Sequence, residues 1–372
     1  MLNEKAILEG KIKNHARLNF DILDGMVDWV RVIDNSGVVI YANQPMKEAL
    51  GNDIIGRRCY RVLGKCKACD RCITQTTIST GIISEKEEHI GDRIFAVKSS
   101  PVKDLEGNNY AAVEVFRDVT KERKLEKELK KKNKKMNKDL SFARTLQKRV
   151  LPKKGVYDNI EVDYMYKPCE MLSGDIFDIF HIDDNHIGFY IADVVGHGVT
   201  ASMMTMFVKQ TMKVIKKDTL SPSETLEKLH KEFLDLKLEY DKYFTIFYGV
   251  LDKRDNTLKY VNGGHNSIPI LFNKNKVELL ETRGYPISYL FDSVSYDEKI
   301  AKLNKNDKLL FYTDGIIECR NRDNEQFGIE RLLDIVKKDD GDIIDNIKSY
   351  VDEFIYGEHD DDLAIFTIEV KE

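Results

Sequence analysis

The sequence predicts an α+β protein with antiparallel sheets near both ends of the chain and a long helix between them. Short runs with β-type alternation, separated by turn residues, fill the N-terminal third. Residues 120–150 are charged, contain neither glycine nor proline, and carry apolar residues at helical spacing. Residues 153–372 have apolar runs of strand length near their start and end, with helical periods between. At 372 residues the chain is long enough for two or more domains.

Composition and charge argue against a nucleic-acid-binding, membrane-spanning or secreted protein. The formal net charge of −5 does not indicate nucleic-acid binding. The sequence has no run of about 18 apolar residues, so we expect no membrane span. Residues 1–5 lack the apolar core of a secretion signal, and we expect a cytoplasmic protein. Its six cysteines are then thiols or metal ligands rather than disulfides.

The first elements are an amphipathic helix and a small sheet. Residues 1–24 place apolar side chains on one side of a helix. Residues 29–33 and 38–42 flank the turn Asp34-Asn35-Ser36-Gly37 and predict a hairpin, which is followed by a short helix over residues 46–50. Three later runs have the length and alternation of strands: residues 83–89, 93–101 and 110–118.

Residues 25–119 resemble a PAS sensor domain. The resemblance is carried by Val32-Ile33-Asp34, Gly37, Ile40-Tyr41-Ala42-Asn43, and the exit segment Arg117-Asp118-Val119-Thr120-Lys121-Glu122-Arg123. It implies an antiparallel sheet with helices on one face and does not identify a ligand. We expect Trp29, Tyr41 and Phe95 to belong to the core of this domain.

Residues 120–152 predict a helical linker that ends at Pro152. Apolar residues recur along it at intervals of three, four and seven: Leu125, Leu129, Met136, Leu140, Ala143, Leu146 and Val150. This spacing predicts a coiled coil and a homodimer, although Lys132 interrupts the apolar seam. The lysine run at residues 130–135 is either a solvated face or a patch for acidic partners.

The next region contains Asp193 at a junction between a strand and a helix. Residues 187–192 form an apolar run typical of a buried strand, and residues 199–215 have helical period. Between them lies Asp193-Val194-Val195-Gly196-His197-Gly198, in which the glycines permit a sharp turn. Alone, this motif is equally typical of a plain turn with a capping aspartate. Further along, Ser221-Pro222-Ser223-Glu224 is a capping box and predicts a helix starting at residue 222.

Three more acidic positions stand at the edges of β-like runs. Asp175 opens the run 176–182, Asp314 follows the run 309–311, and the triplet Asp360-Asp361-Asp362 precedes the run 363–370. If these carboxylates converge with Asp193, they cannot all stay ionised without a cation. Hard oxygen ligands with no adjacent His or Cys cluster favour Mg²⁺ or Mn²⁺. Two such ions can polarise a phosphoryl group and activate water.

Residues 153–372 resemble a SpoIIE/RsbU-type member of the PPM (PP2C-like) serine/threonine phosphatases. The motifs that carry this resemblance, in order, are Ser173-Gly174-Asp175, Ala192-Asp193-Val194-Val195-Gly196-His197-Gly198, Gly263-Gly264-His265-Asn266, Tyr312-Thr313-Asp314-Gly315-Ile316-Ile317-Glu318, Phe327-Gly328-Ile329-Glu330-Arg331-Leu332 and Asp361-Asp362-Leu363. The resemblance implies an α/β/β/α sandwich with two Mn²⁺ or Mg²⁺ ions at one end. We expect a PAS-regulated signalling phosphatase.

The resemblance also assigns roles by position. Asp193 would bridge both metals, with the backbone carbonyl of Val194 as a further ligand, and Asp175 and Asp314 would each add a carboxylate. Asp361 is expected to be the last ligand. Its neighbours in the triplet remain competitors: Asp360 and Asp362. The catalytic positions are then Asp193 and Asp175.

The implied reaction is direct hydrolysis of phosphoserine or phosphothreonine on a protein. The identity of the general acid stays open, with His197 the nearest candidate, while His265 is expected to brace a loop. No arginine stands where a motif would bind phosphate, so substrate anchoring is left mostly to the metals. The resemblance implies a phosphorylated anti-sigma-factor antagonist of the STAS type as substrate. The alternatives are a catalytically inactive PAS-containing scaffold and a redox-sensing binding protein.

Four cysteines lie within the PAS region. Cys66, Cys69 and Cys72 form a C-x-x-C-x-x-C run, and Cys59 could complete a set of four ligands. Four thiolates suit Zn²⁺ or an Fe–S cluster. Free thiols and a reversible disulfide switch are the alternatives. We expect a bound metal or cluster, and the spacing does not decide between zinc and iron.

Overall fold

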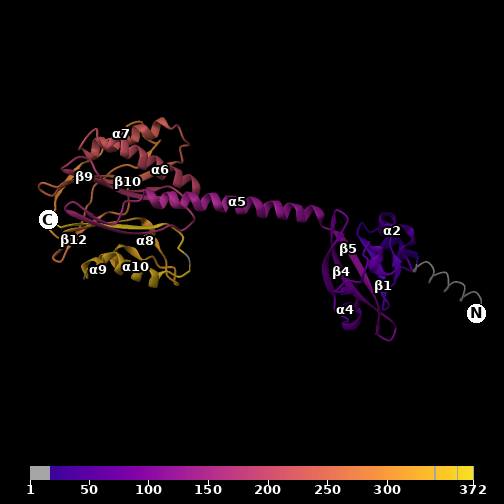
Figure 1. The fold of residues 1–372 in the computed structure, drawn as a ribbon. Helices are drawn as coiled ribbons and strands as arrows, with labels where there is room; N and C mark the ends of the chain where they lie inside the picture. Colours follow the sequence, from indigo (N-terminus) through magenta and orange to yellow (C-terminus); the bar gives the residue numbers. More distant parts are fainter. Residues whose placement is uncertain (1–16, 339–340, 358, 372) are drawn as a thin grey trace, which may run out of the picture. The chain divides into compact units, whose positions relative to one another are not determined.

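The computed structural model describes residues 17–338, 341–357 and 359–371. Contacts divide the chain into two compact units, residues 1–135 and 136–372 (Figure 1). The N-terminal helix predicted over residues 1–24 is described only for residues 17–24, which are helical; residues 1–16 lie outside the described residues. Within the described parts of the chain, no helix is long and apolar enough to cross a bilayer.

The N-terminal unit contains a five-stranded antiparallel sheet with the order β2-β1-β5-β4-β3. Its strands are β1 (Trp29–Asp34), β2 (Val39–Ala42), β3 (Ser84–Ile90), β4 (Arg93–Lys103) and β5 (Asn109–Asp118). Its helices are α2 (Gln44–Leu50), the 3₁₀ helix η1 (Asn52–Ile54), α3 (Cys59–Val62) and α4 (Ile73–Thr80). The predicted hairpin and the three later strands are confirmed.

Local chemistry explains the hairpin. The Asp34 carboxylate accepts hydrogen bonds from the backbone N–H groups of Ser36 and Val38, both at 2.9 Å. Gly37 takes a positive φ of 80°, which completes the turn. The core beneath the sheet contains Trp29 and Phe95 as expected, with ring centroids 4.4 Å apart. Tyr41 is only half-buried and stacks against Phe20 instead of lying in this core.

The predicted linker is a single helix, α5 (Thr120–Val150). Its apolar seam is largely open to solvent, as the exposed fractions of three large side chains show: Leu125 at 56%, Leu129 at 59% and Met136 at 56%. Glu126 forms ion pairs with Arg123 and Lys130 on the same helix. The helix is confirmed, and the dimer stays a prediction.

The C-terminal unit contains two antiparallel sheets. The first has the order β15-β11-β10-β9-β8, with β14 paired to β10, and the second has the order β13-β12-β16-β17-β7-β6. The first sheet comprises β8 (Asp175–His181), β9 (His186–Val194), β10 (Tyr243–Asp252), β11 (Thr257–Gly263), β14 (Ile287–Ser288) and β15 (Lys299–Lys302). The second comprises β6 (Gly155–Tyr157), β7 (Ile160–Lys167), β12 (Ile270–Asn273), β13 (Lys276–Leu279), β16 (Lys308–Tyr312) and β17 (Leu363–Val370).

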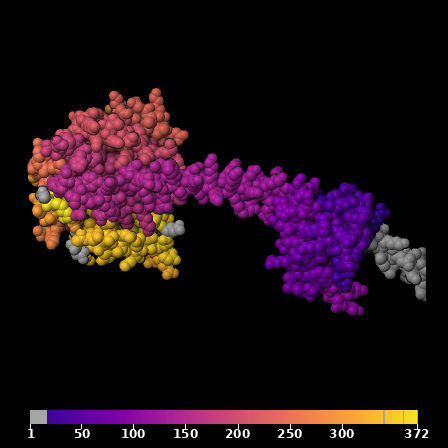
Figure 2. Space-filling model, viewed as in Figure 1, coloured from indigo at the N-terminus to yellow at the C-terminus, as the bar shows by residue number. Residues whose placement is uncertain are grey.

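Helices cover the outer face of each sheet. The helices of this unit are α6 (Gly198–Ile215), α7 (Pro222–Asp235), α8 (Asp314–Glu318), α9 (Gly328–Lys337) and α10 (Ile343–Phe354). One buried cluster lies between the sheets, a second joins the first sheet to α6 and α7, and a third joins the second sheet to α9 and α10. The two helical layers lie on opposite faces of the unit (Figures 1 and 2). The predicted α/β/β/α sandwich is confirmed, as is the start of α7 at Pro222, where Ser221 caps the helix.

Candidate metal centre

The four acidic positions converge from both sheets at one end of the sandwich. Asp175 is the first residue of β8 and lies directly opposite Asp193 of β9 in the strand register. Opposed residues on antiparallel strands have neighbouring side chains. Asp314 begins α8 directly after β16, and Asp361 precedes β17, the strand paired with β16. Asp362, next to Asp361, accepts a hydrogen bond at 2.7 Å from the backbone N–H of Gly174, next to Asp175, so the two pairs lie near one another.

These carboxylates are held in surroundings that favour their neutral forms. Burial raises the pKa of Asp193 to about 8, and the charges of Asp314 and Asp361 add to the effect. Burial also raises the pKa of Asp175 well above its ordinary value, with Asp193 as the next cause. The pKa values of Asp314 and Asp361 are also raised, mainly by loss of hydration, although the Asp361 side chain keeps one side open to solvent. Among the described residues, no Lys or Arg forms an ion pair with any of the four.

One atom of this cluster has no partner in the described protein. The Oδ2 atom of Asp175 is buried and accepts no hydrogen bond from a described residue. A buried acceptor without a partner is costly unless another group, such as a cation, binds it. The donor set is therefore suited to a hard divalent ion. Within the described residues, however, no three His, Cys, Asp or Glu side chains lie close enough to form a closed set of metal ligands.

Asp362 has a different role from its neighbours in the triplet. Its carboxylate accepts hydrogen bonds from Cys169 N at 2.8 Å, Ser173 Oγ at 2.7 Å and Gly174 N at 2.7 Å. It thereby ties the start of β17 to the loop that precedes Asp175. Asp360 and Asp361 are solvent-accessible, and neither carboxylate makes comparable contacts with that loop. The Asp362 carboxylate is thus already occupied by hydrogen bonds from the protein.

Two glycines allow this close approach of loop and strand. A Cβ atom on Gly174 would lie 2.7 Å from the backbone oxygen of Gly196 and 3.0 Å from that of Val194. A Cβ atom on Gly315 would lie 2.1 Å from the backbone oxygen of Asp362. Neither contact is tolerable, so any side chain at these positions would push the acidic segments apart.

The two histidines of the motifs are held in different ways. Burial lowers the pKa of His265 to about 4, so its ring is neutral at pH 7. Its Nε2 atom lies 3.2 Å from Tyr312 O and must donate there, which leaves Nδ1 to accept from Thr245 Oγ1 at 3.1 Å. These two hydrogen bonds hold the loop that carries His265 against β10 and β16, in agreement with the prediction that His265 braces a loop. His197 is exposed, with its Nδ1 atom 2.9 Å from Glu170 Oε1.

A contact from the linker helix was not predicted. Gln147, in the last turns of α5, is buried; its Nε2 atom donates to Ser173 O at 2.7 Å, and its Oε1 atom accepts from Ser173 N at 3.0 Å. This amide pair binds α5 to the loop that leads into Asp175. The spacing of apolar residues located the helix face but contained no signal for a polar contact.

The cysteine cluster does not form the predicted metal site. Cys66 is exposed, the other three are partly buried, and the described residues contain no set of three that could hold an ion. The Cys69 sulfur instead accepts contacts from Lys65 Nζ at 3.7 Å and Lys86 Nζ at 3.6 Å. Burial raises the pKa of the Cys59 thiol, which disfavours the thiolate that binds a metal. The prediction of Zn²⁺ or an Fe–S cluster at Cys59, Cys66, Cys69 and Cys72 is not supported.

Family comparisons agree with this geometry. Residues 183–371 match the family described as Stage II sporulation protein E (SpoIIE). The chain belongs to the SpoIIE family. Residues 23–124 match the PAS fold, so a PAS domain precedes the PP2C-like domain of this SpoIIE-family chain. Both predicted resemblances are confirmed.

Curated relatives of this SpoIIE-family chain include two proteins of Bacillus subtilis (strain 168). Phosphoserine phosphatase RsbP is 28% identical over 183 residues, which is 48% of this chain and 45% of that protein. Phosphoserine phosphatase RsbU is 24% identical over 204 residues, which is 53% of this chain and 59% of that protein. The chain thus spans about half the length of the curated relatives it matches.

Solved structures show the same fold. The SiaA-PP2C domain of Pseudomonas aeruginosa aligns with a TM-score of 0.55 at 16% identity, covering 63% of this chain and 96% of that domain. The PP2C phosphatase domain of SpoIIE from Bacillus subtilis, with a fragment of its regulatory domain, aligns with a TM-score of 0.50 at 13% identity. That alignment covers 78% of this chain and 82% of the SpoIIE fragment.

Proposed function

We propose that this chain is a metal-dependent protein serine/threonine phosphatase regulated by its PAS domain. The observation that carries the proposal is the cluster of Asp175, Asp193, Asp314 and Asp361, which no described Lys or Arg neutralises. Such a cluster gains most from binding divalent cations. RsbP and RsbU, named as phosphoserine phosphatases, support phosphoserine as the group hydrolysed.

The proposed ligands are those that the family resemblance implies, and contacts decide only between Asp361 and Asp362. Asp193 would bridge two Mn²⁺ or Mg²⁺ ions, with the Val194 carbonyl as a further ligand, and Asp175 and Asp314 would each contribute a carboxylate. Asp361 is proposed over Asp362 because the Asp362 carboxylate already accepts three hydrogen bonds from the protein. When bound, the ions would supply Lewis-acid polarisation of the phosphoryl group and activation of water for in-line attack.

The remaining residues would position this cluster. Asp362 and Gln147 hold the loop before Asp175 from two sides, and His265 holds β10 against β16. A neutral His265 adds no positive charge that would compete with a metal ion. His197, which is exposed and paired with Glu170, remains the candidate general acid.

We further propose that the linker helix transmits the PAS signal as a homodimer. The exposed apolar residues Leu125, Leu129 and Met136 would be covered by a second copy of α5. A change in pairing would reach the loop before Asp175 through the Gln147 amide. The STAS-type anti-sigma-factor antagonist as substrate, the cytoplasmic location and the domain limits 25–119, 120–152 and 153–372 stay predictions.

The test of the proposed activity is hydrolysis of p-nitrophenyl phosphate and of a phosphoserine protein by the full chain with Mn²⁺. Hydrolysis that depends on Mn²⁺ and stops with a chelator is expected. A folded protein that hydrolyses neither substrate at any Mn²⁺ concentration would contradict the proposal. That result would favour the inactive scaffold or the redox-sensing protein.

A further inference from the structure

A cavity of about 360 Å³ adjoins the acidic cluster and has no assigned role. One of its lining residues, Asp361, belongs to the cluster, and another, Gly315, directly follows the cluster residue Asp314. The other walls come from the loop after α8 and from the segment between α10 and β17. Its volume lies within the range of pockets that accept small ligands or short peptide segments. A chain whose phosphoserine reached the metal ligands would therefore have its neighbouring residue beside this cavity.

Arg320 is the one Lys or Arg among the described residues that line the cavity. Its Nη1 atom donates to Asn324 O at 2.9 Å, so the guanidinium is anchored by one edge. No described carboxylate forms an ion pair with it. The remaining N–H groups can donate to a carboxylate from another molecule, for which the planar guanidinium is well suited.

Two further groups of the cavity wall suit a peptide. The Nδ1 atom of His359 is buried and has no hydrogen-bond partner among the described residues. Tyr356, which lines the cavity, is exposed, with the Arg322 guanidinium 5.6 Å from the centre of its ring. The wall therefore offers a polar atom without a partner and an aromatic face beside the charge of Arg320.

Arg320 determines which charge of substrate side chain the cavity can attract, because the other charged residues of its wall are acidic. Three carboxylates also line the cavity: Glu318, Asp360 and the cluster residue Asp361. A carboxylate of a substrate is attracted only where Arg320 lies, and without Arg320 the same cavity would attract a basic side chain.

We propose that this cavity is a specificity subsite in which Arg320 binds an acidic residue next to the phosphoserine of the protein substrate. The proposal rests on the proposed phosphatase activity and adds to it the class of peptide that is preferred. In this proposal Arg320 binds a side chain of the substrate polypeptide, whereas the phosphoryl group binds at the acidic cluster and its ions.

The test uses the full chain with Mn²⁺, p-nitrophenyl phosphate and phosphoserine peptides that carry Asp or Lys next to the phosphoserine. Both the preceding and the following position are varied. We expect kcat/KM to favour the Asp peptide by about twofold to fivefold at one of the two positions, which is typical of one accessible ion pair. Arg320→Glu should reverse that preference, and Arg320→Lys should retain it in weaker form.

Two controls make the result specific. Hydrolysis of p-nitrophenyl phosphate, which has no peptide, should be unchanged in Arg320→Glu, and this also shows that the variant is folded. Arg254→Glu introduces the same charge change at the opposite end of β10 and should leave the peptide preference unchanged.

The outcomes separate the two proposals. Equal preference in wild type and Arg320→Glu, or a parallel loss of p-nitrophenyl phosphate hydrolysis, would overturn the subsite. Absence of Mn²⁺-dependent hydrolysis of every substrate by the wild-type chain would overturn the phosphatase proposal itself, and the subsite with it.

Discussion

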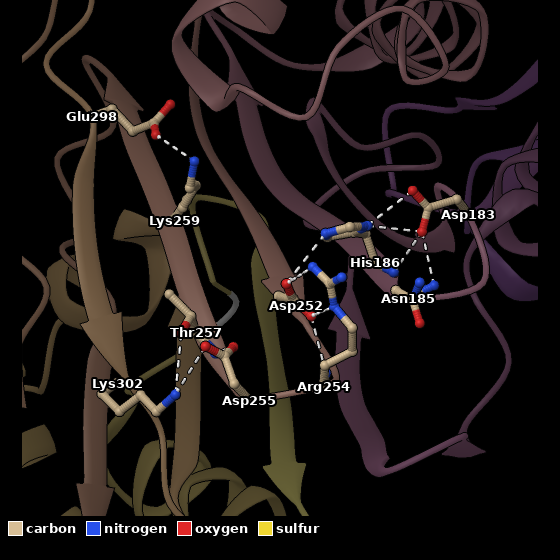
Figure 3. A network of polar contacts seen from close by, with 10 residues as sticks. All are labelled: Asp183, Asn185, His186, Asp252, Arg254, Asp255, Thr257, Lys259, Glu298 and Lys302. Carbon is tan, nitrogen blue, oxygen red and sulfur yellow. Dashed lines mark hydrogen bonds and ion pairs between the residues drawn. The ribbon is translucent and has the colours of Figure 1, made fainter.

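An aspartate lies at each end of the β9–β10 strand pair, and the surroundings shift the pKa values of these two aspartates in opposite directions. In the register of these strands, Asp193 pairs with Thr245 at one end, and His186 pairs with Asp252 at the other. At the His186 end, Asp252 lies 3.0 Å from Arg254 Nε and 3.5 Å from His186 Nε2 (Figure 3). The Arg254 side chain holds the pKa of Asp252 well below its usual range. At the other end, burial and neighbouring acids raise the pKa of Asp193 to about 8.

This contrast shows which carboxylates the protein neutralises with its own side chains. Asp255 is paired with Lys302 at 3.2 Å, and its pKa is lowered, first by a hydrogen bond from Thr257 (Figure 3). The acids beside Asp193 receive no such partner from the described residues, and burial adds to the cost of their charge. Charge balance at that end must therefore come from protons or from bound cations.

The largest expected effect is a loss of hydrolysis when an aspartate at the Asp193 end of the strand pair is substituted. Asp193→Asn should reduce Mn²⁺-dependent hydrolysis by more than about a hundredfold, since loss of groups that merely support metal ligands already costs tenfold to a hundredfold. Asp314→Asn should have a similar effect. Asn keeps the shape of the side chain and removes the charge that holds the cation. The measurement is kcat/KM for p-nitrophenyl phosphate.

Asp252→Asn is the matched control at the opposite end. It removes the partner of Arg254 and His186, and it should leave hydrolysis within about twofold of wild type. The reason is that this ion pair lies at the other end of the β9–β10 pair from Asp193. If Asp193→Asn and Asp252→Asn had equal activity, the assignment of the catalytic end would be wrong.

The second prediction concerns pH in the absence of metal. The pKa of Asp193 is about 8 in the folded protein against 3.8 ordinarily, so the folded state binds this proton more tightly. Its contribution to the free energy of unfolding is present below pH 4 and is lost as pH rises through about 8. Asp252, with a lowered pKa, contributes in the opposite sense: its contribution is present above pH 3.8 and is lost as pH falls from 3.8 through its lower folded-state pKa.

Thermal unfolding of the metal-free chain between pH 5 and 8 checks this prediction. Tm should fall across that interval by more in the wild type than in Asp193→Asn, and Mn²⁺ should raise Tm more at pH 8 than at pH 5 because protons compete for the ligands. Identical pH profiles for wild type and Asp193→Asn would count against the raised pKa.

A smaller effect is expected from the linker contact. Gln147→Leu would leave the Ser173 N–H and C=O without the partners that Gln147 supplies, at a cost of about 1–3 kcal/mol, and would loosen the loop before Asp175. We expect reduced kcat with a higher Mn²⁺ requirement. Lys148→Gln changes an exposed neighbour on the same helix and should have no effect. If Gln147→Leu had the same Mn²⁺ dependence as the wild type, the contact of Gln147 with Ser173 would have no influence on the acidic cluster.

The smallest effect on basal hydrolysis is expected from the apolar seam of α5. The double variant Leu129→Glu, Met136→Glu should convert a dimeric full-length chain into a monomer, because both exposed side chains lie on the predicted pairing surface. Light scattering measures the mass. A wild-type chain that is already monomeric would refute the proposed dimer.

The sequence predicted most strands and helices because their apolar runs and turn residues are local signals. The hairpin at Asp34–Gly37 and the cap at Ser221 depend on contacts within a few residues. The convergence of Asp175 and Asp193 was also predictable, since each stands at the edge of an apolar run.

Long-range contacts were not predictable in this way. The distinct roles of Asp361 and Asp362 depend on hydrogen bonds to a loop almost 190 residues earlier, and the contact of Gln147 with Ser173 spans 26 residues. The described residues do not support the cysteine prediction, because regular spacing in a loop does not by itself bring side chains together.

Mn²⁺ binding by the metal-free full-length chain tests the central claim most directly. Titration followed by the electron paramagnetic resonance signal of free Mn²⁺ should show two bound ions in the wild type and in Asp252→Asn. Asp193→Asn should lose at least one of them, because its carboxylate is proposed to bridge both. A wild-type chain that binds no Mn²⁺, or an Asp193→Asn variant that binds it as the wild type does, would contradict the assignment of this end of the sandwich as a metal centre.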